Sequence, residues 1–245
     1  MKTKDSLYVC GDSYMSPVVD FPNTHHSEML SNYLGYDLVP LSRGGMSNLG
    51  ICLQVEEAIK NKASLVLFGT TSSDRIEVPL GKDNDDYTLD NVLYCDQASL
   101  SSQQRNTYKK PYLISDTLYC FMESDHHHLP YSPHVKSVFQ LRRDVKEYYK
   151  SIFDFRWKQK IDNWAIYACL HKLYVSGIPF VFVYPKSHLV QECSSFLEEK
   201  HYLAKMLDVN FSNNGEDPGY HTSFDDQKIL YNILLEHLDQ FGIIN

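Results

Sequence analysis

Short buried runs alternate with amphipathic segments through the first 70 residues, and this alternation restricts the fold more than any other feature. The runs at Leu7–Cys10, Asp37–Leu41 and Ser64–Gly69 are typical of buried strands. Segments with helical spacing separate them. A strand–helix–strand–helix–strand order predicts a parallel sheet with right-handed crossover connections.

Two segments between these runs have the apolar spacing of one helix face. The apolar positions of the first segment are Met29, Leu30, Tyr33 and Leu34. Asn23 or Thr24 is expected to cap this helix, and Gly35 is expected to end it. The apolar positions of the second segment are Ile51, Val55, Ala58 and Ile59. Ser47 or Asn48 is expected to cap that helix.

The sequence predicts a single domain over residues 1–245 that is interrupted by an insertion. Residues from about 76 to 132 are polar and weakly periodic, which predicts an insertion with some local structure, either a lid or a partner-binding element. Beyond it, helices are expected at 135–149, 155–174 and 225–241, and a strand at 178–183. Phe153–Trp157 is interpreted as core and as a helix start.

Composition limits the class of protein. Hydrophobic residues make up 43% of the chain and charged residues 22%, which is enough apolar surface for a packed core. The formal net charge of −8 argues against a general nucleic-acid or anionic-membrane surface. The six cysteines have no pairing or metal-site spacing, and no signal-peptide or membrane-spanning run is present. We expect a cytoplasmic protein, with unconventional export or incorporation into a virion as alternatives.

Gly11-Asp12-Ser13 follows the first predicted strand directly. Open α/β sheets bind ligands at the carboxyl ends of their strands, so Ser13 is a candidate nucleophile whose backbone amide could serve an oxyanion. Gly11 permits the tight turn that this placement needs. The alternative is an ordinary helix cap, and the tripeptide alone does not separate the two.

Three further segments carry polar groups to the expected site. Ser42–Asn48 follows the second strand, and its glycines allow backbone amides to approach a ligand closely. Gly69–Arg75 follows the third strand, and its hydroxyls either donate to an oxyanion or cap a helix. Asp217 precedes His221 on a segment just before the last helix, a spacing that can bring the carboxylate to the far nitrogen of the imidazole. A solvent-facing histidine is the alternative.

Taken together, these segments resemble the conserved blocks of the SGNH (GDSL-type) hydrolases from about residue 7 to residue 241, apart from the insertion. The matching blocks are Gly11-Asp12-Ser13, Gly44-Gly45 with Ser47-Asn48, Gly69-Thr70-Thr71-Ser72, and Asp217 with His221. The resemblance implies an α/β three-layer sandwich with a central parallel sheet, as in SGNH and flavodoxin-like folds. Thr71 stands where the family has an oxyanion-binding asparagine, and the hydroxyl of Thr71 or Ser72 is the expected substitute. The Asp217–His221 spacing is one residue longer than usual, so a Ser-His dyad is the alternative to a triad.

The resemblance also implies a chemistry: hydrolysis of an acyl ester through an acyl-enzyme, without metal or organic cofactor. His221 would remove the proton of Ser13, and Asp217 would orient His221. The amides of Ser13 and Gly45, with Thr71 as a third donor, would hold the oxyanion. Candidate supporting residues are Asp12, Gly44, Asn48 and Ser72. The expected substrate is a small-molecule or glycan ester, with an O-acetylated carbohydrate as the family-level suggestion.

Other features of the sequence suggest different kinds of site. His126–His128, with Asp125 and His134 nearby, suggest a metal site, but consecutive side chains point to opposite sides, so we interpret them as a polar loop. Lys109-Lys110 and Arg142-Arg143 are too separated for a nucleic-acid surface. The alternative function is a catalytically weak or inactive SGNH-like module for binding or assembly, favoured by the missing asparagine and the long insertion. The sequence does not determine the oligomeric state.

Overall fold

Five parallel strands form the centre of the protein. The computed structural model describes residues 5–17, 21–43, 46–71, 73, 75, 151–185, 206–209, 223–240 and 242. The strands are β1 (Ser6–Cys10), β2 (Asp37–Pro40), β3 (Leu65–Gly69), β4 (Phe180–Pro185) and β5 (Met206–Val209). Their order is β2-β1-β3-β4-β5, with every neighbouring pair parallel. The chain leaves β1 toward one edge and returns to its other side, so a topological switch point lies at the carboxyl ends of β1 and β3.

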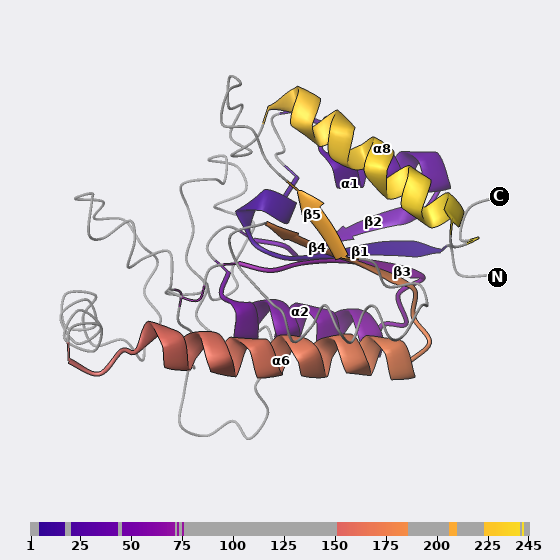
Figure 1. Ribbon diagram of the computed structural model, residues 1–245. Helices are drawn as coiled ribbons and strands as arrows, with labels where there is room; N and C mark the ends of the chain where they lie inside the picture. Colours follow the sequence, from indigo (N-terminus) through magenta and orange to yellow (C-terminus); the bar gives the residue numbers. More distant parts are fainter. Residues whose placement is uncertain are drawn as a thin grey trace, which may run out of the picture.

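Helices cover both faces of the sheet (Figure 1). The first face carries α1 (His26–Leu34) and α8 (Phe224–Gln240), which pack together, and the other carries α2 (Asn48–Lys60) and α6 (Phe155–Val175), which also pack together. This arrangement confirms the predicted α/β three-layer sandwich with a central parallel sheet. Within the described ranges, no helix is long and apolar enough to cross a bilayer.

The central strands alternate their side chains between two apolar layers. Tyr8 of β1 and Phe68 of β3 belong to the layer under α2 and α6, whereas Leu7 and Leu67 belong to the layer under α1 and α8. Leu7, Leu67 and Phe68 are fully buried, and each such side chain contributes about 1.5–3 kcal/mol relative to exposure. β1 and β3 are therefore the rigid middle of the fold, and the segments after them start from fixed positions.

The observed caps of α1 and α2 agree only in part with those predicted from the sequence. Ser47 caps α2 and Gly35 ends α1 in the left-handed conformation, as predicted. The cap of α1 is His25, not Asn23 or Thr24. His25 forms a capping box with Glu28, whereas the Thr24 hydroxyl donates to the carbonyl of Phe21. An imidazole nitrogen can accept a backbone hydrogen bond as a carboxamide oxygen does. Cap propensities favour Asn and Thr over His, so they did not predict His25.

The start of α6 is exposed, which corrects the interpretation of Phe153–Trp157 as core. Asp154 caps the helix, so the predicted helix start is confirmed. Phe155 is 46% exposed and Trp157 is 59% exposed. The first turns of α6 extend beyond α2 (Figure 1), and no other described helix covers them. The predicted insertion at 76–132 and the helix expected at 135–149 lie outside the described residues, and the extent of the domain stays a prediction.

Candidate functional site

Ser13 lies immediately beyond the carboxyl end of β1, at the switch point of the sheet. It begins a short 3₁₀ turn, η1 (Ser13–Met15), whose N-cap is Asp12. The Ser13 side chain is half-buried, and its hydroxyl forms no hydrogen bond with a described residue. The hydroxyl is not among the fully buried unpaired atoms, so it faces solvent. The fold therefore leaves an accessible hydroxyl where parallel sheets bind ligands.

Close packing fixes the turn that carries this hydroxyl. The Gly11 amide donates to Oε1 of Gln54 at 2.7 Å, and Nε2 of Gln54 donates back to the Gly11 carbonyl at 3.4 Å. The Met15 side chain lies against Gly11 and Gly69 so tightly that a Cβ there would come within 2.4 and 2.5 Å, respectively, of Met15 Cγ. Glycine is required at both positions because real Cβ atoms do not approach other atoms so closely. The turn is thus pressed onto the ends of β1 and β3.

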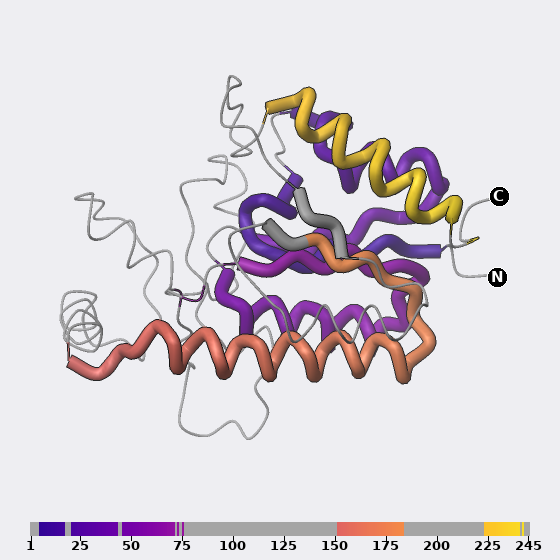
Figure 2. The backbone as a smooth tube through the Cα atoms, in the orientation of Figure 1, coloured from indigo at the N-terminus to yellow at the C-terminus, as the bar shows by residue number. Residues whose placement is uncertain are grey.

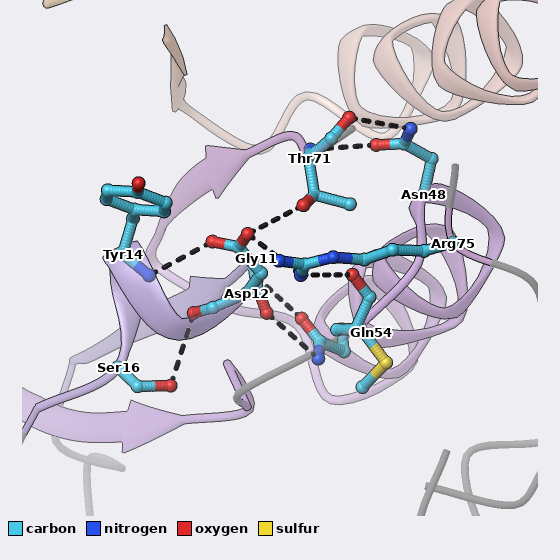
Figure 3. A network of polar contacts seen from close by, with 9 residues as sticks. Gly11, Asp12, Tyr14, Ser16, Asn48, Gln54, Thr71 and Arg75 are labelled. Carbon is cyan, nitrogen blue, oxygen red and sulfur yellow. Dashed lines mark hydrogen bonds and ion pairs between the residues drawn. The ribbon is translucent and has the colours of Figure 1, made fainter. Parts of the chain in front are cut away.

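The Asp12 carboxylate is buried at the centre of a polar network (Figure 3). Oδ1 accepts the Tyr14 amide at 3.0 Å. Oδ2 accepts the Thr71 hydroxyl at 2.6 Å and Nη1 of Arg75 at 3.1 Å. A buried carboxylate needs such partners, because an unpaired charge in the interior is costly. Asp12 therefore joins the Ser13 turn to the segment after β3.

Asn48, at the first turn of α2, clamps the segment after β3. Its Oδ1 accepts the Thr71 amide at 2.9 Å, and its Nδ2 donates to the Thr71 carbonyl at 2.9 Å and to Oδ2 of Asp162 at 3.0 Å. Asp162 on α6 is itself paired with Lys158. Thr71 thus has both of its donors engaged, the amide by Asn48 and the hydroxyl by Asp12. Its expected role as a third oxyanion donor would require one of these bonds to break.

Two adjacent buried histidines join the Ser13 turn to the beginning of α8. Nδ1 of His25 lies 2.7 Å from the Ser27 hydroxyl and accepts the Ser27 amide, which leaves Nε2 to donate to the Tyr14 carbonyl at 3.3 Å. The amide and Nδ1 of His26 both reach Oε1 of Gln227 on α8, at 3.0 and 2.8 Å. Figure 2 shows that α8 begins at the end of the sheet where β1 and β3 finish.

Burial keeps both imidazoles neutral. Desolvation lowers the pKa of His26 from 6.5 to about 4, against the opposing effect of its bond to Gln227. The pKa of His25 is also well below its usual value, first because of burial and then because of the neighbouring His26. Neither ring is exposed, so these histidines support the turn and are not candidates for proton exchange with a substrate.

This burial predicts acid sensitivity. Between about pH 6.5 and 4 the unfolded chain binds more protons at His26 than the folded chain does, so stability falls as the pH is lowered through this window. The loss amounts to about 3 kcal/mol at most. Urea denaturation at pH 7 and pH 4.5 should show a smaller pH difference for His26→Asn than for the wild type. His171→Asn, on the exposed side of α6, is the control and should retain the wild-type difference.

Several residues expected at the site lie outside the described residues: Gly44, Gly45, Ser72, Asp217 and His221. Their roles stay predictions. The site also contains groups that sequence reasoning left unassigned, namely Arg75, Gln54 and the His25–His26 pair. The available signal was Asp12 itself, because a carboxylate predicted to follow a buried strand requires a cationic partner, and Arg75 belongs to the polar segment after the third strand. Among the described residues, no three His, Cys, Asp or Glu side chains gather as a metal site would require.

The likeness of the chain to known proteins is found among solved structures. No family model matches it, and no curated protein matches it. Among solved structures, one similar chain is described by the words "The active site of a carbohydrate esterase displays divergent catalytic and non-catalytic binding functions". It is 10% identical with a TM-score of 0.47, and the match covers 98% of this chain and 70% of that one. A likeness this distant does not indicate a function, so the function is inferred from the site.

Proposed function

We propose that this protein is a serine hydrolase that cleaves acyl esters, with Ser13 as the nucleophile. The observation that carries the proposal is the solvent-facing hydroxyl of Ser13, which has no hydrogen-bond partner among the described residues and lies on a tightly held turn at the topological switch point. A structural serine at a helix cap normally uses its hydroxyl for a backbone amide, but here Asp12 caps the turn and Ser13 is left available. A fixed position also suits catalysis, because the attacking atom must be held close to the carbonyl carbon.

His221 is the proposed general base, with Asp217 as its orienting carboxylate. Support comes from Ser223, two residues after His221, which is anchored at the start of α8 by hydrogen bonds from its amide and hydroxyl to Asp226. Two residues of chain span up to about 7 Å. The start of α8 lies at the same end of the sheet as the Ser13 turn and is tied to it through His26 and Gln227, which supports a base from the segment that precedes α8.

In the proposed reaction, Oγ of Ser13 attacks the ester carbonyl carbon while its proton passes to His221. The carbonyl oxygen becomes an oxyanion held by the amides of Ser13 and Gly45. The proton then passes to the leaving alcohol as the ester C–O bond breaks, which leaves an acyl-enzyme. Water, deprotonated by His221, attacks the acyl carbon, and release of the acid restores the Ser13 hydroxyl.

The remaining candidates act through the nucleophile turn. Asp12 and Thr71 hold the turn against the segment after β3, and Asn48 holds that segment in place. We therefore place Thr71 as a positioning residue instead of a direct oxyanion donor, with Gly44 and Ser72 proposed to shape the adjoining backbone. The proposed substrate is a small-molecule or glycan ester, an O-acetylated carbohydrate being the first to examine.

A fluorophosphonate probe tests the nucleophile directly. Attack by an activated serine on the phosphorus expels fluoride and leaves a covalent adduct whose position mass spectrometry identifies. We expect the adduct on Ser13 in the wild type, and none in Ser13→Ala or His221→Ala. Ser176→Ala, at the end of α6, should label like the wild type. An unlabelled wild-type protein, or labelling that persists in Ser13→Ala, would contradict the proposal.

A further inference from the structure

The guanidinium of Arg75 is held beside the Ser13 turn through one of its nitrogens. Nη1 donates to Oδ2 of Asp12 at 3.1 Å and to the carbonyl of Met46 at 3.3 Å (Figure 3). A terminal guanidinium nitrogen carries two N–H groups, so these two bonds use both. The group is thereby fixed between the turn that carries Ser13 and the residue that precedes the N-cap of α2.

The other edge of the guanidinium is open. Nε and Nη2 form no hydrogen bond with a described residue, and neither belongs to the fully buried unpaired atoms. The Arg75 side chain is 24% exposed, so this edge faces solvent. Nε and Nη2 present two parallel N–H groups, the arrangement that binds a carboxylate with two hydrogen bonds.

Only Nη1 of Arg75 is engaged with the Asp12 carboxylate. The Asp12 carboxylate is already shared among three donors, two of which, the Tyr14 amide and the Thr71 hydroxyl, come from elsewhere in the turn and from the segment after β3. The N-terminus of α2 adds positive partial charge near Met46, and no acidic residue occupies its first turn. The N–H groups of Nε and Nη2, together with the N-terminus of α2, can therefore receive an anion at this edge, although the chain as a whole carries a net charge of −8.

We propose that Nε and Nη2 of Arg75 bind a carboxylate on the substrate, so that the preferred ester carries an anionic group close to its reacting carbonyl. This inference rests on the proposed function, since Ser13 follows Asp12 directly and supplies the attacking atom. A single guanidinium edge, with its charge partly shared by Asp12, matches a planar monoanion. Arg75 is then a residue that determines specificity.

Two esters of matched length test the preference: mono-(4-nitrophenyl) succinate, which ends in a carboxylate, and 4-nitrophenyl butyrate, which ends in a methyl group. The measured quantity is the ratio of their kcat/KM values. Arg75→Gln should lower this ratio about 10- to 100-fold, the range that charge-assisted hydrogen bonds contribute. Arg75→Lys should also lower it, because an ammonium keeps the charge but lacks the parallel pair of N–H groups.

Arg75→Lys separates a loss of substrate binding from a loss of folding. Arg75→Gln leaves the buried Asp12 without its cation, whereas Arg75→Lys can retain the ion pair, and thermal denaturation reports whether each variant is folded. An unchanged ratio in a folded variant would overturn the proposal. That result includes the case in which both esters slow equally, which would place Arg75 on the oxyanion or in a purely structural role.

A binding measurement separates failure of this inference from failure of the proposed hydrolase. NMR titration of Ser13→Ala with monomethyl succinate and with methyl butyrate should show saturable binding of the anion only, and Arg75→Gln in the same background should abolish it. If no ester is hydrolysed but this binding occurs, the anion site stands and the hydrolase proposal fails. If hydrolysis depends on Ser13 but binding does not depend on Arg75, the hydrolase stands and the anion site fails.

Discussion

Replacing Ser13 by alanine is expected to lower the hydrolysis of a chromogenic acetyl ester to the uncatalysed background. Loss of a serine nucleophile reduces kcat by about 10³-fold or more, because the remaining groups bind the ester but cannot form the acyl-enzyme. The Ser13 hydroxyl forms no hydrogen bond with a described residue, so its removal leaves no buried donor or acceptor unpaired. The unfolding midpoint of the variant should therefore stay close to that of the wild type.

Two comparisons make this measurement decisive. His221→Ala should lower the rate by a similar factor, because nucleophile and base act as a unit and their losses are not additive. Ser176→Ala removes a hydroxyl that donates to the Lys172 carbonyl at the end of α6, and its rate should equal that of the wild type. Equal background rates for the wild type and Ser13→Ala, across acetylated carbohydrates as well as the chromogenic ester, would point to the binding or assembly module instead.

Replacing Asn48 by leucine is expected to destabilise the protein by about 3–5 kcal/mol, which is exceptional for a single substitution. The side chain is buried and satisfies the amide and carbonyl of Thr71 together with Asp162. Leucine fills a similar volume but offers no polar atoms. Each buried group left unpaired costs about 1–3 kcal/mol.

Asn61→Leu is the matched control for this measurement. Asn61 caps the other end of α2, where its exposed side chain bonds to Glu57, and its substitution should change stability by about 0.5 kcal/mol or less. Urea denaturation compares the two variants. Equal small losses would mean that the Asn48 contacts do not hold the segment after β3, and the proposed positioning of Thr71 and Asp12 would lose its support.

Much of the fold was predictable because it follows from local patterns. The continuous apolar runs of β1 and β3 indicated strands buried on both faces, and Gly35 marked the end of α1. β5 escaped prediction because its four residues include Asp208 and show no clear pattern without the neighbouring strand. The hydrophobicity of Trp157 predicts a place in the core, but the length of α6 relative to α2 decides which of its turns are covered, and Trp157 is exposed.

The candidate site was also predictable only in part. The segments that carry Ser13, Asn48 and Thr71 could be placed at one end of the sheet, since carboxyl ends of parallel strands lie together. Which side chain bonds to which could not be read from spacing. Thr71 faces Asp12 instead of an open site, and Arg75 approaches from a segment whose conformation no periodicity specifies.

Hydrophobic periodicity and turn chemistry in the sequence determined that this chain forms a parallel α/β sandwich and that a Gly-Asp-Ser turn follows its first strand. Only the tertiary structure decided that Asp12 caps the turn, that Arg75 and Asn48 hold it from two other segments, and that the Ser13 hydroxyl is left without a described partner. The physical reason is range: periodicity reflects burial along one element, whereas hydrogen-bond partners 23 to 63 residues apart are selected only when packing brings their segments together.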